Sequence, residues 1–95
     1  MSLASNCSDK LVTNLGQCPA PGIISLSCDN NALTSLDVSQ HTNLLNLSCK
    51  NNQLSSLIFN DNIETLICNN NVLTCIDVNS TTNLTYLNCS DNMLE

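Results

Sequence analysis

A block of sequence centred on cysteine recurs five times along the 95-residue chain. The copies read NCSDKLV, SCDNNAL, SCKNNQL, ICNNNVL and NCSDNML, and their cysteines are 21, 21, 19 and 21 residues apart. An apolar residue stands five positions after every cysteine, and an asparagine stands three positions after all but the first. A motif that repeats together with its surroundings indicates a repeating architecture, in which each unit packs against its neighbours.

Apolar residues and asparagine hold fixed positions around each cysteine. In the second copy these positions are Ile23, Leu26, Cys28, Asn31 and Leu33. The later copies repeat them as Leu44, Leu47, Cys49, Asn52, Leu54, then Ile63, Leu66, Cys68, Asn71, Leu73, and finally Leu84, Leu87, Cys89, Asn92, Leu94. This frame resembles the leucine-rich repeat, L-x-x-L-x-L-x-x-N/C-x-L in units of about 20–29 residues. The segments LTSLDVSQHTN and LTCIDVNSTTN are similar to the short repeats of bacterial surface and secreted proteins.

The resemblance implies a leucine-rich-repeat solenoid, which is a right-handed superhelix. Periodicity supports a repeating strand, because Leu26 and Cys28 alternate with polar neighbours. Leu36 and Val38 alternate again on the return segment, and a unit of 19–21 residues with two bends leaves little room for a helix. We therefore expect a parallel β-sheet on one face, extended or 3₁₀ segments on the other, and little α-helix.

The copies divide the chain into a single leucine-rich-repeat domain over residues 1–95 with about 4.5 repeats. Its units are an atypical N-terminal unit at 2–22, three units at 23–43, 44–62 and 63–83, and a partial unit at 84–95. Because the last unit stops before its return segment, we expect the chain to be a fragment of a longer protein. Leu84, Leu87, Cys89 and Leu94 would then form an open apolar edge, which predicts end-to-end self-association through the C-terminal coil.

Five cysteines take the second inward position of successive strands. They are Cys7, Cys28, Cys49, Cys68 and Cys89. We expect reduced, buried thiols, since free cysteine behaves as a small apolar residue. Disulfides are disfavoured because neighbouring parallel strands, about 4.8 Å apart, hold the Cβ bonds parallel. A straight column does not converge on zinc, so no metal or other cofactor is expected. Cys18 and Cys75 lie off the column and are too far apart to pair, and Cys18 is expected to be either a filler of the fold or an exposed thiol.

An asparagine column runs beside the cysteine column, three residues further along each unit. Its members are Asn31, Asn52, Asn71 and Asn92. At the bend after a strand the backbone groups lose their ladder partners, and an amide side chain can both donate to them and accept from them. We expect these side chains to satisfy the backbone and to stack from coil to coil, as structural residues.

The charge balance excludes two classes of partner. The chain carries two basic residues against eight acidic ones, for a net charge of −6. Nucleic acids and anionic membrane surfaces both need clustered lysine or arginine, and no apolar run is long enough for membrane insertion. Asp9 and Asp29 are expected to form a solvated acidic rim. The first ten residues lack the basic start and apolar stretch of a signal peptide, while the resemblance implies a secreted or cell-surface protein.

The sequence contains no arrangement typical of an enzyme. His41, the only histidine, stands in the segment SQHTN without a nucleophile at a recognisable spacing. The resemblance instead implies a non-enzymatic module that binds a protein partner of unknown identity through the exposed face of the sheet. The outward positions expected to make the contact are Asn46, Ser48, Thr65, Ile67, Tyr86 and Asn88. The alternative is a structural spacer or stalk of a larger surface or secreted protein, which the small polar side chains of this face favour.

One unit is two residues shorter than the others. The segment SLIFNDN at 56–62 stands in place of SLDVSQHTN at 35–43. Phe59 occupies the position of Val38 and Val78 in the neighbouring units. We expect Phe59 to fill the core there and the outer surface to dip at residues 60–62.

Overall fold

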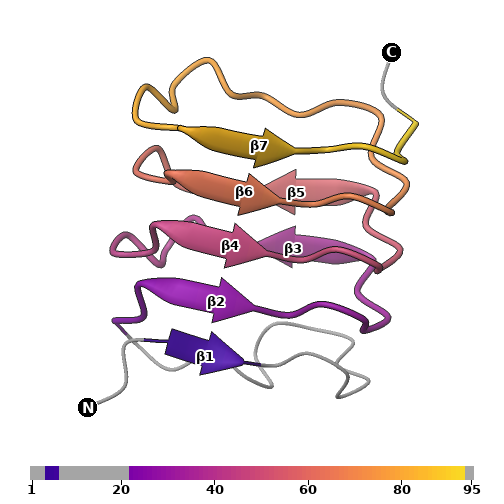
Figure 1. Ribbon diagram of the computed structural model, residues 1–95, viewed down its shortest axis with the longest axis horizontal. Helices are drawn as coiled ribbons and strands as arrows, with labels where there is room; N and C mark the ends of the chain where they lie inside the picture. Colours follow the sequence, from indigo (N-terminus) through magenta and orange to yellow (C-terminus); the bar gives the residue numbers. More distant parts are fainter. Residues whose placement is uncertain (1–3, 7–21, 94–95) are drawn as a thin grey trace.

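The computed structural model describes residues 4–6 and 22–93, and this part of the chain contains strands and turns but no helix. Five short strands begin 21, 21, 19 and 21 residues apart. They are β1 (Ala4–Asn6), β2 (Ser25–Ser27), β4 (Asn46–Ser48), β6 (Thr65–Ile67) and β7 (Tyr86–Asn88). They form one parallel sheet in the order β1-β2-β4-β6-β7. Successive coils therefore stack as a β-solenoid with a repeat of about 21 residues (Figure 1).

The three central strands of this sheet are each centred on a leucine that points into the molecule. Leu26, Leu47 and Leu66 are at most 3% exposed, and the residues that flank them are partly exposed. The pairing is in register, with Leu47 opposite both of the other leucines. The ladder continues one residue past the strand, because the N–H of Cys28 donates to the carbonyl oxygen of Ser48 at 2.8 Å. This pairing places the cysteine inside the stack, next to the leucine.

The return segments of two coils form a second parallel sheet. It consists of β3 (Ser35–Asp37) and β5 (Ser56–Ile58), with Leu36 opposite Leu57. In Figure 1 these two strands lie behind the five-stranded sheet and run in the opposite direction. The described residues contain no 3₁₀ turn, so of the two expected conformations the extended one is correct for these segments. The equivalent segment of the next coil, residues 75–78, forms no strand.

The core is a single cluster of buried side chains inside the coils. Its members are Ile23, Leu26, Cys28, Leu33, Leu36, Val38, Leu44, Leu47, Cys49, Leu54, Ile63, Leu66, Cys68 and Leu73. All are aliphatic or thiol side chains, and fully burying an aliphatic side chain of this size contributes about 1.5–3 kcal/mol. Because the members recur once per unit, each coil buries its apolar side against the adjacent coils.

Inward-pointing asparagines close the bends that follow β4, β6 and β7. The Nδ2 of Asn52 donates to the carbonyl oxygen of Cys49 on its own coil at 3.0 Å and to that of Cys28 on the preceding coil at 3.1 Å. Its Oδ1 accepts the N–H of Leu33, also on the preceding coil, at 3.1 Å. The same three bonds are made by Asn71 with Cys68, Cys49 and Leu54, and by Asn92 with Cys89, Cys68 and Leu73. Each of these amides therefore ties its coil to the one before it.

The first asparagine of each Asn-Asn pair has a separate role, which was not among the expectations from the sequence. Asn30, Asn51 and Asn70 have φ angles of 57°, 59° and 58°. Asparagine tolerates this left-handed conformation better than most residues, because its short polar side chain bonds locally. The Nδ2 of Asn51 donates to Oδ1 of Asn30 at 2.7 Å, and the Nδ2 of Asn70 donates to Oδ1 of Asn51 at 2.8 Å. The pair thus combines a turn residue on the surface with a bridging residue inside.

The short unit differs from the expectation at Phe59. This side chain is only partly buried against the core, whereas Val38 is fully buried at the same position. The buried polar residue of this turn is Asn60, which is 8% exposed. Its Nδ2 donates to the carbonyl oxygens of His41 at 2.7 Å and Leu44 at 3.4 Å. The same position in the next, full-length unit, Val78, is also only partly buried, so Val38 alone fills the core at this position in the described units.

Candidate functional site

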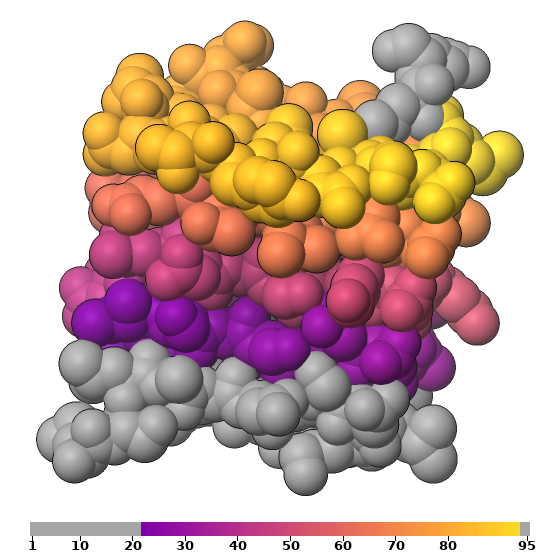
Figure 2. Space-filling view, viewed as in Figure 1, coloured from indigo at the N-terminus to yellow at the C-terminus, as the bar shows by residue number. Residues whose placement is uncertain are grey.

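The outer face of the five-stranded sheet carries the six residues for which a contact role was predicted. They are Asn46 and Ser48 on β4, Thr65 and Ile67 on β6, and Tyr86 and Asn88 on β7. The register places Thr65 between Asn46 and Tyr86, and it places Ile67 between Ser48 and Asn88. The structure therefore gathers them in two columns across three adjacent strands, on the face whose coils form stacked bands in Figure 2.

On the β2 and β4 side of this face, polar side chains bond to one another. The Nδ2 of Asn46 donates to Oγ of Ser25 at 3.0 Å, and Oγ of Ser48 donates to the carboxylate of Asp29 at 2.7 Å. The same carboxylate accepts the backbone N–H of Lys50 at 3.0 Å. The prediction of a solvated acidic rim is therefore wrong for Asp29, whose partly buried carboxylate connects two coils.

The β6 and β7 side of the face is more apolar, and it carries an exposed tyrosine. Tyr86 is 53% exposed, and within the described part of the chain its hydroxyl makes no hydrogen bond. Ile67, on the neighbouring strand, is diagonal to Tyr86, a separation of about 7–8 Å between Cα atoms in a sheet. Thr65 lies directly opposite Tyr86. These three side chains, of which Tyr86 is exposed and Thr65 and Ile67 are partly exposed, form a patch that we call the Tyr86 patch.

The thiols inside the solenoid are shielded. Cys28, Cys49 and Cys68 are free and buried, which confirms their predicted burial. Burial raises the pKa of Cys28 and of Cys68 to about 12, and it raises the pKa of Cys49 well above its usual value. Since the thiolate is the reactive and metal-binding form, these three thiols act as core side chains. Cys89 is partly buried and Cys75 is exposed.

Within the described residues no group of three or more histidine, cysteine, aspartate or glutamate side chains is placed to hold a metal ion. Cys7, Asp9 and Cys18 lie outside these residues, so the structure describes the cysteine column only from Cys28 onward. The first described member of the asparagine column is Asn31, whose Nδ2 donates to the carbonyl oxygen of Cys28 at 2.9 Å.

The coil that contains β7 covers its apolar side chains less completely than the coils before it. Leu87 is 38% exposed, and Leu84 and Cys89 are partly buried. Leu94, the fourth residue of the apolar edge expected from the sequence, lies outside the described residues. End-to-end association through this coil stays a prediction.

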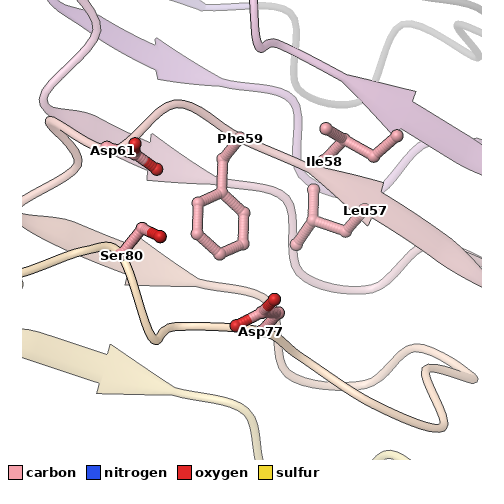
Figure 3. Close-up of a pocket in the computed structure, with 6 residues that line it drawn as sticks. All are labelled: Leu57, Ile58, Phe59, Asp61, Asp77 and Ser80. Atoms are coloured by element: carbon pink, nitrogen blue, oxygen red, sulfur yellow. The ribbon is translucent and has the colours of Figure 1, made fainter.

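A hollow of about 240 Å³ lies on the opposite face of the molecule, beside the short unit (Figure 3). It is lined by Leu57, Ile58, Phe59, Asp61, Asp77 and Ser80. The sequence predicted a dip in the surface at residues 60–62, and Asp61 comes from that segment. Nothing in the sequence indicates that Phe59 lines the hollow or that the next coil supplies its other wall.

The parallel sheets and the spacing of about 21 residues define the class of this chain, which is a β-solenoid repeat protein. Comparison with protein families, with curated proteins and with solved structures finds no match. The class therefore rests on the repeat and on the geometry of the coils. In the part of the chain that the structure describes, no helix has the length and apolar character needed to cross a membrane.

Proposed function

We propose that this chain is a non-enzymatic binding module that contacts a protein partner through the outer face of its five-stranded sheet. The observation that carries the proposal is the Tyr86 patch, where an exposed aromatic side chain lies beside a β-branched aliphatic one. Tyrosine is enriched among the residues that dominate binding energy, because it combines a large apolar ring with a polar hydroxyl. A rigid sheet holds such an anchor in place and lowers the entropy lost on binding.

The leucine-rich-repeat class and its right-handed superhelix belong to the same proposal. They are supported by the columns of leucine, cysteine and asparagine at one spacing, together with a parallel strand in each described unit. Solenoids of this kind present an extended sheet whose outward residues vary while the frame is kept. The similarity of the return segments to short bacterial repeats supports a secreted or cell-surface location.

The proposed contact surface runs from β4 to β7. At its β4 end, Asn46 and Ser48 already bond to Ser25 and Asp29, so they offer fewer groups to a partner. At its other end, Thr65, Ile67 and Tyr86 have no such network. We therefore place the energetic centre of the contact at the Tyr86 patch, with the polar residues as a surrounding rim.

A spacer or stalk is the second candidate function. It is favoured by the β2 and β4 side of the face, where the small polar side chains satisfy one another and expose no anchor. A regular stack of coils also gives a fixed rise for each repeat, which suits a structural role.

A display screen of proteins against the immobilised chain separates the two functions. If the Tyr86 patch is the anchor, Tyr86→Ala should weaken partner binding by about thirtyfold, the effect of losing a hot-spot residue worth about 2 kcal/mol. Val72→Ser is the matched control, because Val72 is 42% exposed but lies outside the sheet face. Equal binding by wild type and Tyr86→Ala for every partner recovered would leave the spacer as the better account.

A further inference from the structure

The hollow lies between the return segment of the short unit and the return segment of the unit that follows it. The return strands of the two preceding units, β3 and β5, pair in register. The following return segment, residues 75–78, does not extend this sheet. Side chains from both sides line the space between them, and Figure 3 shows the ring of Phe59 in its centre, with Asp77 and Ser80 across from it.

The hollow combines an apolar floor with a negative rim. Leu57, Ile58 and Phe59 supply the apolar part, and Ile58 is 49% exposed. Asp61 and Asp77 are exposed carboxylates at the rim, and no basic side chain is among the lining residues. Asp77 has one oxygen held by the backbone N–H of Asn79 at 3.0 Å, which fixes its orientation. The negative charge of the rim adds to the net charge of −6 of the whole chain.

From this geometry we infer that the hollow binds a cationic side chain, with arginine preferred, presented by a polypeptide. A guanidinium is planar, stacks on an aromatic ring and pairs with carboxylates through its several N–H groups. Here Phe59 provides the ring, and Asp61 and Asp77 provide the carboxylates. A lysine ammonium is a compact and strongly hydrated charge, so it gains less from an apolar floor.

The volume of the hollow argues against a drug-sized ligand, and its small number of oxygen ligands argues against a metal ion such as Ca²⁺. Its volume of about 240 Å³ is below the range of about 300–1,000 Å³ that is typical of pockets for drug-sized molecules. That volume suits one long side chain. A hard cation such as Ca²⁺ takes about six to eight oxygen ligands, whereas the oxygen-bearing side chains of this hollow come from only Asp61, Asp77 and Ser80. The site lies on the face opposite the proposed contact surface, so the two proposals stand independently.

The test is an NMR titration of the labelled full chain with the peptide acetyl-Gly-Arg-Gly-amide. We expect saturable shifts of the Phe59 ring and of the Asp61 and Asp77 amides, with a Kd of about 1 mM. The same peptide with citrulline in place of arginine has the same shape but no charge, and it should bind at least about fivefold more weakly. Raising the salt to about 0.5 M should weaken the arginine peptide, because the carboxylates are exposed.

Variants of the chain locate the site. Asp77→Asn and Phe59→Leu should each weaken the arginine peptide by about two- to fivefold, which is the effect of losing one exposed ion pair or one cation–π contact. Asp37→Asn is the matched control, because Asp37 holds the equivalent position two units earlier and accepts the N–H of Ser39 at 2.9 Å in the same way. This control should leave binding unchanged.

Four results would overturn the inference. They are equal binding of the citrulline peptide, equal or tighter binding of the same peptide with lysine in place of arginine, an Asp77→Asn effect no larger than that of Asp37→Asn, and displacement of the arginine peptide by Ca²⁺ at a concentration lower than that of the peptide. Asp77→Asn keeps the test valid if Phe59→Leu fails to fold, since the carboxylate of Asp77 is exposed.

Discussion

Replacing Asn71 with alanine tests whether the buried amides hold neighbouring coils together. The substitution leaves the N–H of Leu54 without its acceptor, the Asn71 Oδ1 at 3.0 Å. It also removes the donor that joins the carbonyl oxygens of Cys49 and Cys68, each of which keeps a second amide donor. A buried unsatisfied donor costs about 1–3 kcal/mol and each lost bond about 0.5–1.5 kcal/mol. We therefore expect Asn71→Ala to lower the free energy of unfolding by about 3 kcal/mol.

The assay is urea denaturation followed by circular dichroism, with hydrogen exchange of the Leu54 amide as a local readout. The control is Asn69→Ala, two residues away, because Asn69 has a buried Oδ1 that makes no hydrogen bond in the described part of the chain. Removing an oxygen that is already unsatisfied should cost about 1 kcal/mol or less. The reasoning fails if Asn71→Ala costs no more than Asn69→Ala, or if the Leu54 amide keeps its protection in the Asn71→Ala variant.

Three further predictions concern the thiols, the surface turn and the short unit. Burial raises the pKa of Cys28 and of Cys68 from 9.0 to about 12. The stability that the neutral thiols provide is therefore fully present below pH 9 and is lost as the pH rises towards 12. Urea unfolding at about pH 8 and about pH 10.5 should therefore give a lower free energy of unfolding at the higher pH, and no change would contradict the burial of these thiols. Asn51→Gly should be more stable than Asn51→Ala by about 1 kcal/mol, since the φ of 59° strains alanine but not glycine, and thermal melts giving equal stability would contradict this. Phe59→Ala should cost about 1–2 kcal/mol in chemical denaturation, less than the roughly 3–5 kcal/mol of a fully buried phenylalanine, and a cost in that higher range would place Phe59 in the core.

The period of the sequence was enough to predict the inner frame of the solenoid. Leu26 and Leu47 were placed at the centres of parallel strands, and the free, buried state of Cys49 followed from the same alternation. These features could be predicted because a repeated position has the same surroundings in each of the central coils. A buried apolar residue at one copy therefore indicates the same burial at the next.

The features that were missed depend on how individual turns are built. The left-handed conformation of Asn30 and Asn51 had a signal in the sequence, since asparagine or aspartate stands two residues after the cysteine in several copies. The phase of the repeat predicts Phe59 in the core, but the buried side chain of that turn is Asn60, and Phe59 is only partly buried, as Val78 is in the next unit. The carboxylate of Asp29 looked like a surface charge because its acceptor role depends on a serine 19 residues later.

The hollow could be predicted only in part, for the same reason. Shortening one unit indicated a dip near Asp61, and this was visible in the sequence. The position of Asp77 across from Phe59 depends on how far the next return segment is separated from β5, which the repeat alone does not specify.

The bridging asparagines also give the order of synthesis a physical meaning. The N–H of Leu33 has its acceptor on Asn52, 19 residues later, and the N–H of Leu54 has its acceptor on Asn71, 17 residues later. During translation, therefore, these two N–H groups lack their protein acceptor until the next coil has emerged and docked. A paused ribosome would leave the newest coil loose while the older coils are closed. The solenoid is thus suited to vectorial folding from the N-terminal side, with each new coil completing the one made before it.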